Sequence, residues 1–344
     1  MLATYKKADV SFRTIKDIGA EGKNSKVHLA HDEYLDCEIA LKEILKSSIK
    51  STDDYFLEAK LLYASSHPNI VKINYAAVDT DNIYVSMPYY KNGSLSSKME
   101  SVNLTSREII RYSIHFLSGL HHIHSKGLIH FDIKPNNIML SDRDEALLSD
   151  FGLAEQLDAE GLAQPKLIYN LHTPPERYLT KKFNLTYDIY QAGLTMYRMA
   201  LGTLLFQQEV ETAGEKGDFA QQIVDGKFPS KNFPPHINKK LQKIIIKCLE
   251  PDTDKRYQSV LSILNDLSII DDGSLDWRLE FTAHSIAWKK ALDDATLTLT
   301  LSNDDRDCEC IRVYLDGRNS RRFGAMCEKN LTPTKLSNLF KNNG

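Results

Sequence analysis

The spacing of apolar residues changes twice along this chain of 344 residues, and each change limits the folds open to it. Residues 12–90 alternate short β-branched runs with turns, which predicts a small sheet. From Thr105 to about Ile270 apolar residues recur at helical intervals, and beyond Ile270 the period of two returns. This order predicts an α+β protein with a small β-rich lobe, a larger helical lobe and a small C-terminal unit.

The first lobe is expected to hold a sheet and one packed helix. Apolar and β-branched residues predict strands over residues 26–30, 38–42, 70–75 and 82–87. Between the second and third of these, residues 53–64 carry a partial helical stripe, which predicts the helix.

Helices dominate the second lobe. Thr105 can cap a helix that begins at Ser106, because its hydroxyl can accept from an unpaired N–H of the first turn. Further helices are predicted over residues 187–204 and 239–249, and the helical part should end near Ile270.

The C-terminal unit returns to strands. Residues 271–274, Asp-Asp-Gly-Ser, predict a linker or a tight turn. Residues 295–301 and 311–315 alternate apolar and polar side chains, which predicts paired strands. Thr332 followed by Pro333 then predicts the N-cap and first position of a short helix.

Composition excludes several classes of protein. Hydrophobic residues make up 42% and charged residues 26%, and the net charge of −3 points to neither nucleic acid nor an anionic membrane. No apolar run approaches the roughly 18 to 20 residues of a membrane span, and the N-terminus lacks a signal-type apolar segment. Five cysteines without a C-x-x-C pair favour a reducing, cytoplasmic setting, with a C-terminal metal site as the alternative.

Two linked patterns carry the chemistry. Residues 130–137 read His-Phe-Asp-Ile-Lys-Pro-Asn-Asn, and residues 150–152 read Asp-Phe-Gly. Together they place one potential base, one cation and two potential metal ligands at spacings that phosphoryl transfer can use. They resemble the H-x-D-x-K-x-x-N loop and D-F-G element of the eukaryotic-like (Hanks-type) serine/threonine protein kinases.

This resemblance spans residues 12–270 and implies a bilobal kinase domain, with lobes at about 12–90 and 91–270. It leaves residues 275–344 as a small β-rich accessory domain of open role. ATP and Mg²⁺ are the implied cofactors, and proteins are the implied substrates.

The resemblance assigns the central roles to four residues. Asp132 would accept or orient the proton of the attacking hydroxyl, and Lys134 would neutralise charge on the transferred group. Asn137 and Asp150 would hold Mg²⁺, since hard cations take oxygen ligands.

The expected phosphate-binding turn spans Gly19 to Val27. Only small side chains allow backbone N–H groups to approach phosphate oxygens closely, so Gly19 and Gly22 fit this role. Ser25 stands where the family has its third glycine, and the first two glycines are one residue further apart than usual. An ordinary hairpin turn is the alternative, and the departures put nucleotide affinity in doubt.

Lys42 resembles the strand lysine that holds the α- and β-phosphates, with Ala40 beside the adenine. Glu58, on the predicted helix, resembles the glutamate that pairs with this lysine. Glu43 is the rival partner, but neighbouring strand residues point to opposite faces, which favours Glu58.

Residues 83–90 resemble the strand and hinge that join the two lobes. The resemblance makes Met87 the gatekeeper behind the adenine and places the backbone of Pro88 to Tyr90, with Tyr89 at the centre, against the base. Proline lacks an N–H, but the first hinge position supplies a carbonyl, so nothing is lost there.

One departure from the family pattern concerns regulation. Phe131 replaces the arginine that commonly precedes the catalytic aspartate and binds a phosphate on the activation segment. We therefore expect activity that does not depend on phosphorylation of that segment. Lys134 is typical of the serine/threonine branch, although Tyr169 stands near the usual Gly-Thr pair and the selectivity signal there is missing.

Other residues match structural positions of the family. Glu176, in Thr-Pro-Pro-Glu, is expected to pair with Arg256, and Asp188 is expected to brace the catalytic-loop backbone. His130 should pack beneath Phe151. The nearby histidines could also suggest a metal site, but they fit the segment that leads to this loop: His121, His122 and His124.

Three functions remain open from the sequence. The first is an active serine/threonine kinase, and the second is a pseudokinase that serves as a nucleotide-binding scaffold. The third is a small-molecule kinase, which the Pro-Pro-Glu element, Asp188 and Arg256 disfavour. The C-terminal unit could recruit a regulatory or substrate protein. Its arginines could contact nucleic acid, but a solvated hairpin is favoured and no nucleic acid is expected: Arg318, Arg321 and Arg322.

Overall fold

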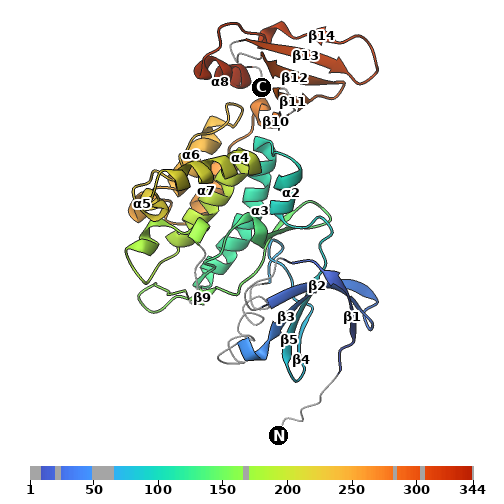
Figure 1. Cartoon of the computed structure of the whole chain (residues 1–344), viewed down its shortest axis with the longest axis vertical. Helices are drawn as coiled ribbons and strands as arrows, with labels where there is room; N and C mark the ends of the chain where they lie inside the picture. Colours follow the sequence, from blue (N-terminus) through green and yellow to red (C-terminus); the bar gives the residue numbers. More distant parts are fainter. Residues whose placement is uncertain are drawn as a thin grey trace.

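The computed structural model describes residues 9–19, 25–48, 66–165, 170–281, 285–302 and 307–342. Gly22, Glu58, Tyr169 and the predicted helix over residues 53–64 lie outside these ranges. Figure 1 shows the N-terminal sheet at one end, the helical lobe in the middle and the C-terminal sheet at the other end.

The N-terminal lobe is an antiparallel sheet in the order β1-β2-β3-β5-β4. Its strands are β1 (Phe12–Asp17), β2 (Ser25–Asp32), β3 (Cys37–Leu45), β4 (Tyr75–Val78) and β5 (Asn82–Pro88). The predictions for residues 26–30, 38–42 and 82–87 are confirmed.

The strand predicted over residues 70–75 is wrong. Only Tyr75 of this run belongs to a strand of the sheet, at the start of β4. Ile70 and Val71 are buried and lie against Leu148 of the second lobe, where the Val71 N–H donates to the Leu148 carbonyl at 2.9 Å. The apolar run therefore packs against the helical lobe, which a period of two does not reveal.

The C-terminal lobe is built on helices, as predicted. These are α2 (Leu95–Ser101), α3 (Ser106–Ser125), α4 (Thr186–Glu215), α5 (Phe219–Val224), α6 (Lys239–Cys248) and α7 (Val260–Ser268). Two short strand pairs frame the catalytic loop: β6 (Leu128–Ile129) with β9 (Glu155–Gln156), and β7 (Ile138–Leu140) with β8 (Ala146–Leu148). Thr105 caps α3 as expected and forms a capping box with Glu108.

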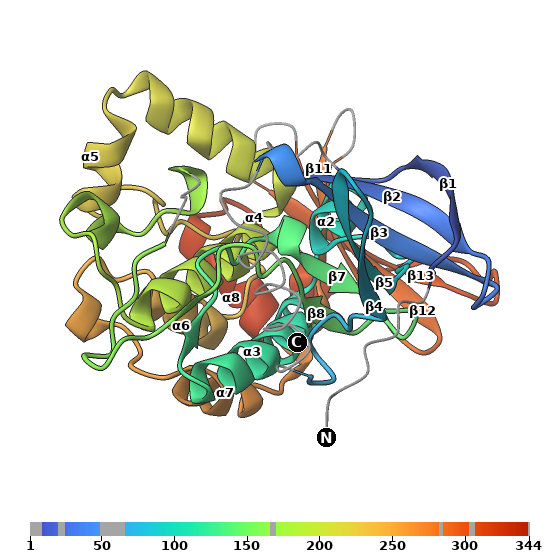
Figure 2. The ribbon, with the colours of Figure 1, turned by 90° about the horizontal axis from the view of Figure 1, so that it is seen from below.

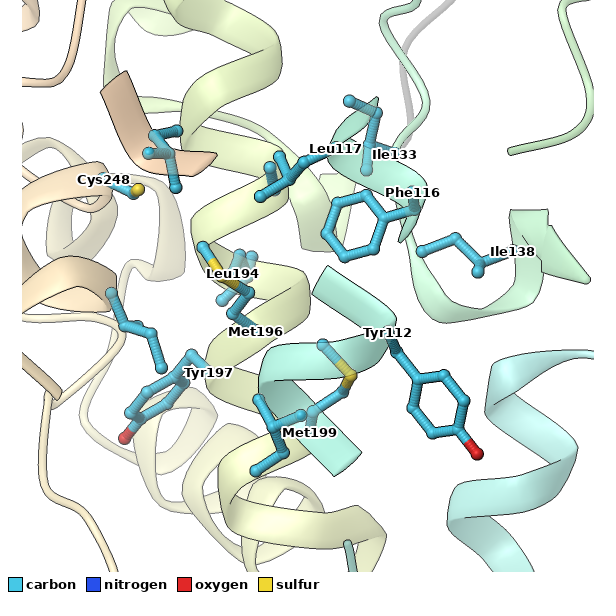
Figure 3. Close-up of a cluster of buried hydrophobic side chains, with 14 of the residues drawn as sticks. Tyr112, Phe116, Leu117, Ile133, Ile138, Leu194, Met196, Tyr197, Met199 and Cys248 are labelled. Carbon is cyan, nitrogen blue, oxygen red and sulfur yellow. The ribbon is translucent and has the colours of Figure 1, made fainter. Parts of the chain in front are cut away.

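The core of this lobe lies between α3 and α4. Tyr112, Phe116 and Leu117 of α3 are fully buried beside Leu194 and Met196 of α4 (Figure 3). Because the two central helices are fixed against each other, the loop between β6 and β7 receives a rigid support.

Helix α4 continues past its predicted end at residue 204. The chain kinks at Gly202, whose φ of 75° is accessible to glycine and unfavourable for other residues, and helical structure then resumes to Glu215. Figure 2 shows α5, which follows this extension, on the opposite side of the molecule from the N-terminal sheet in that view.

The C-terminal domain is an antiparallel meander, β10 to β14 in chain order, with one helix. Its elements are β10 (Arg278–Phe281), β11 (Ile286–Ala291), β12 (Ala295–Leu301), β13 (Cys308–Tyr314), β14 (Arg321–Arg322) and α8 (Pro333–Asn342). The predicted strands and the N-cap are confirmed, since the Lys335 N–H donates to Thr332 Oγ1 at 3.2 Å. Trp277, Trp288 and Phe340 form the centre of its core.

Directed polar contacts join this domain to the helical lobe. The indole N–H of Trp288 donates to His236 Nδ1 at 3.0 Å, and both side chains are buried. Asn103 Nδ2 donates to the Leu279 carbonyl at 3.0 Å, and Arg278 Nη2 donates to Glu108 at 2.9 Å. In the predicted linker over residues 271–274, Asp271 and Asp272 have no regular structure, and Gly273 and Ser274 begin a 3-10 segment, Gly273–Asp276.

Among the residues that the structure describes, no helix has the length and apolar character needed to cross a bilayer.

Candidate active site

Asp188 of α4 holds the backbone of the catalytic loop. Its Oδ2 accepts from the His130 N–H at 2.8 Å, and its Oδ1 accepts from the Phe131 N–H at 2.8 Å. His124 Nε2 contacts the same carboxylate at 2.8 Å. Asp188 is fully buried, so these donors replace the water that its charge has lost. The predicted bracing role is confirmed.

The loop backbone adopts a conformation that needs this support. Phe131 has a φ of 65°, in the left-handed region that aromatic residues seldom occupy. Its carbonyl accepts from Gln191 Nε2 at 3.0 Å, and Gln191 Oε1 accepts from the Ile133 N–H at 3.1 Å. Gln191 was not predicted from the sequence, although it lies three residues after Asp188 and hence on the same helix face.

The loop brings three predicted site residues into direct contact. Lys134 Nζ lies 2.9 Å from Asp132 Oδ2, and Asn137 Nδ2 donates to the same oxygen at 2.7 Å. Asn137 Nδ2 also donates to the Asp132 carbonyl at 2.9 Å. Because these donors share Oδ2, the Oδ1 atom of Asp132 is suited to accept a proton from a substrate hydroxyl. Asp132 itself is buried, which strengthens each of these electrostatic contacts.

Asp150 and Lys42 join the two lobes at the other side of the site. Lys42 Nζ donates to Asp150 Oδ1 at 3.0 Å, and this ammonium is the main cause that lowers the pKa of Asp150 to about 2. Asp150 is therefore ionised at neutral pH. The rival partner of Lys42, Glu43, instead contacts His28 Nε2 at 3.1 Å. The predicted partner Glu58 lies outside the described residues.

Asn137 and Asp150, the two metal-ligand candidates, are linked through contacts of neighbouring residues. Phe151 is buried and packs edge-on against His130, with ring centroids 4.9 Å apart, as predicted. The Ser149 N–H donates to the Asn137 carbonyl at 2.9 Å, which fixes the loop before Asp150 to the loop that carries Asn137. Ser149 was not predicted as part of the site.

The N-terminal sheet brings the predicted nucleotide-facing residues together. In the strand register Ala40 lies opposite Met87, while Lys42 lies opposite both Val27 and Val85. Since alternate residues share a face, Ala40 and Lys42 point to the same side of β3. Tyr89 follows β5 in the connection to the helical lobe, and Ser25 begins β2.

Gly19 occupies a place that a larger residue would not fit. Its N–H lies 3.2 Å from the Val27 carbonyl, and an added Cβ would approach the Val27 Cβ to 2.8 Å. Gly19 therefore allows its own backbone to pass close to Val27.

The donor set fits ATP with Mg²⁺. Lys42 supplies a cation for phosphate, and Asp150 supplies an ionised carboxylate of the kind that hard cations prefer. The side chain of Asn137 donates both of its hydrogen bonds to Asp132 through the amide nitrogen, so its amide oxygen is the atom suited to a metal.

Comparison with known proteins decides the family. A family model described as the protein kinase domain matches residues 12–266, which is more than half of the chain. The chain belongs to the protein kinase family. The expected kinase fold, with a β-rich first lobe and a helical second lobe, is thereby confirmed.

Curated relatives place the chain near the serine/threonine kinases. A probable serine/threonine-protein kinase of Clostridium acetobutylicum is 27% identical over 278 residues, covering 79% of this chain and 41% of the relative. The probable kinase PknB of Lactococcus lactis is 27% identical over 277 residues, covering 78% and 43%. The serine/threonine-protein kinase PknD of Chlamydia caviae is 28% identical over 307 residues, covering 79% and 32%. The chain therefore spans less than half the length of these relatives.

The expected buried ion pair of the kinase lobe is present. Arg256 Nη1 and Nη2 donate to the two carboxylate oxygens of Glu176, each at 2.7 Å, in a bidentate arrangement. This pair ties the Pro-Pro-Glu element to the region after α6.

The metal alternatives gain no support from the described residues, where no three histidine, cysteine, aspartate or glutamate side chains gather around a common point. His124 instead contacts Asp188, and His122 stacks on His67 with centroids 5.1 Å apart. The C-terminal arginine hairpin is solvated and locally paired, since Arg318 contacts Asp316 and Arg322 contacts Glu309.

Proposed function

We propose that this chain is an ATP-dependent protein kinase that transfers the γ-phosphoryl group to serine or threonine hydroxyls. The observation that carries the proposal is the convergence at Asp132. Its carboxylate is contacted by Lys134 at 2.9 Å and Asn137 at 2.7 Å, in the same site as the Lys42–Asp150 pair.

Each residue has a distinct task in this reaction. Bound Mg-ATP would supply the phosphoryl group and part of the charge that offsets it. Asp132 would accept the hydroxyl proton, while the ammonium of Lys134 would offset the negative charge that grows on the transferred group. Lys42 would orient the phosphates, and Asn137 and Asp150 would hold the cation.

The serine/threonine assignment rests on two kinds of support. The relatives carry that description in their names, and Lys134 follows Asp132 at the spacing typical of this branch. Proteins are accordingly the proposed substrate class.

We further propose that activity does not require phosphorylation of the activation segment. Phe131 is buried against Tyr187, with ring centroids 4.9 Å apart and nearly perpendicular rings, and Phe183 packs on both. The activation segment runs between the Asp-Phe-Gly and Thr-Pro-Pro-Glu elements, and Ala163 in its middle exchanges two backbone hydrogen bonds of 2.8 Å with Phe183. Apolar packing thus holds the position of Phe131. The arginine that the family commonly has at this position would instead bind a phosphate on the activation segment.

The domain boundaries and the setting are also proposals. We assign residues 12–270 to the kinase domain and 275–344 to the accessory domain. Strand β13 exposes Ile311 and Val313 to solvent, which supports a role for this domain in binding a regulatory or substrate protein. The five free thiols support a reducing, cytoplasmic environment.

Transfer of label from γ-labelled ATP tests the catalytic proposal. The wild type should label a generic protein substrate, while Asp132→Ala and Lys42→Ala should not, and acid hydrolysis should yield phosphoserine or phosphothreonine. Nucleotide binding without transfer in the wild type would favour the pseudokinase alternative. Phosphotyrosine as the product would contradict the assignment of the substrate hydroxyl.

A further inference from the structure

A partly buried arginine of α4 contacts a histidine that lies just before the Thr-Pro-Pro-Glu element. Arg198 Nη1 lies 2.8 Å from His172 Nε2. His172 is only 3% exposed and immediately precedes the Thr-Pro-Pro-Glu element. Neither residue was singled out by the kinase pattern.

The chemistry of this contact fixes the state of the imidazole. A guanidinium has donors and no acceptor, so His172 Nε2 must accept, and the ring proton must reside on Nδ1. His172 Nδ1 then donates to the Ile133 carbonyl at 3.1 Å. The histidine therefore bridges a helix cation and the peptide that follows the catalytic Asp132.

Gln191 closes the connection from the other side. Its Nε2 donates to the His172 carbonyl at 3.1 Å as well as to the Phe131 carbonyl, and its Oε1 accepts from the Ile133 N–H. Both polar groups of Ile133 are thus held. Its carbonyl accepts from His172 and, at 3.4 Å, from Thr195 Oγ1, and its N–H donates to Gln191. Because Ile133 lies between Asp132 and Lys134, these bonds fix the backbone that carries both proposed catalytic side chains.

The surroundings admit only the neutral ring. Arg198 approaches from α4 and Lys134 from the catalytic loop, and burial together with these two cations lowers the pKa of His172 well below its ordinary value. A protonated ring would lose the Arg198 contact and face two positive charges.

We propose that neutral His172 is a positioning residue for phosphoryl transfer, which acts by fixing the Ile133 peptide and through it Asp132 and Lys134. The inference rests on the proposed kinase function. His172 would act on the loop that carries Asp132, whereas Lys42 and Asp150 would act on the nucleotide and its cation. Loss of His172 should therefore lower kcat and leave the KM for ATP nearly unchanged.

Three variants test this role. His172→Phe keeps the ring and removes both hydrogen bonds, and kcat should fall by roughly 10- to 100-fold. His172→Asn can place its amide donor near the position of Nδ1, and should recover most of that loss. Ile263→Ala, a buried change on α7, is the control that destabilises the lobe without touching the loop. Each variant is assayed well below its own unfolding midpoint.

Hydrogen exchange provides a readout that does not depend on catalysis. The amide of Ile133 should exchange faster in His172→Phe than in the wild type, and Ile263→Ala should not show this local increase. Unchanged exchange at Ile133 would overturn the inference, whether or not the wild type is active. An inactive wild type would by itself count only against the kinase proposal. Wild-type kcat in His172→Phe, or an equal loss in Ile263→Ala, would also overturn it.

Discussion

The guanidinium of Arg256 uses all five of its N–H donors inside the protein. Two go to Glu176, and the others go to the carbonyls of Glu250, Pro251 and Thr186. The side chain is fully buried and lies over the ring of Tyr190. Such a cation is stable in the interior only while its carboxylate partner is present.

Glu176→Gln should therefore destabilise the protein by about 3–5 kcal/mol, because it leaves a buried charge without its counter-ion. Denaturant unfolding of the wild type and the variant measures this difference. Lys182→Gln is the matched control, since it breaks an exposed pair with Asp158 at 2.7 Å, and solvent-exposed pairs contribute little to stability. Equal effects of the two substitutions would contradict the account.

At the residue scale, the sequence was most informative where the side chain itself is the candidate for the chemistry. Asp132, Lys134 and Asn137 occur at fixed short spacings and lie in direct contact, while Asp150 contacts Lys42. Gln191 and His172 act instead through backbone groups of the loop. A backbone contact leaves no characteristic residue pair in the sequence, so these residues could not be predicted from spacing.

At the scale of elements, the kink in α4 depends on one glycine. An added Cβ at Gly202 would lie 2.0 Å from Asn103 Oδ1, and its φ of 75° disfavours any side chain. Gly202→Ala should lower the free energy of unfolding by roughly 1–3 kcal/mol from backbone strain, before the clash is counted.

Gly214→Ala is the matched control on the same helix. Nothing lies within 4 Å of the added Cβ there, so the better helix propensity of alanine should leave stability unchanged or raise it by about 0.5–1 kcal/mol. Calorimetric unfolding of both variants measures the contrast. A stabilising Gly202→Ala would contradict the structure of the kink.

The strength of local signals explains which elements were predicted. Strand β12 alternates regularly, and the capping box of α3 is a local pattern, so each was found. The strand prediction from Ile70 is wrong because apolar residues of this run contact Leu148, which is distant in sequence. The extension of α4 beyond residue 204 was missed because a glycine, here Gly202, usually marks the end of a helix.

At the scale of the whole molecule, His236 reports on the contact between the helical lobe and the C-terminal domain. Burial lowers its pKa to about 3, and its Nδ1 must be unprotonated to accept from Trp288. In the unfolded chain the same ring titrates near 6.5. Since the unfolded state binds more protons between these values, stability is constant above about pH 6.5 and falls as the pH drops toward 3.

His236→Gln should reduce this pH dependence, because glutamine can accept from the indole and does not titrate in this range. Between pH 7 and pH 5 the wild type should lose about 2 kcal/mol more stability than the variant. Urea unfolding of the full chain at both pH values measures the difference. Parallel losses in the two proteins would show that His236 does not link protonation to this contact.

The central claim is that packing around Phe131, rather than a phosphate, supports an active kinase. The decisive measurement is the initial rate of phosphoryl transfer by the full chain after phosphatase treatment, with mass spectrometry confirming that no phosphate remains. Asp132→Asn provides the inactive reference. The account predicts an immediate, linear rate equal to that of untreated protein. A rate no higher than that of Asp132→Asn, or a lag that ends only as the segment becomes phosphorylated, would contradict it.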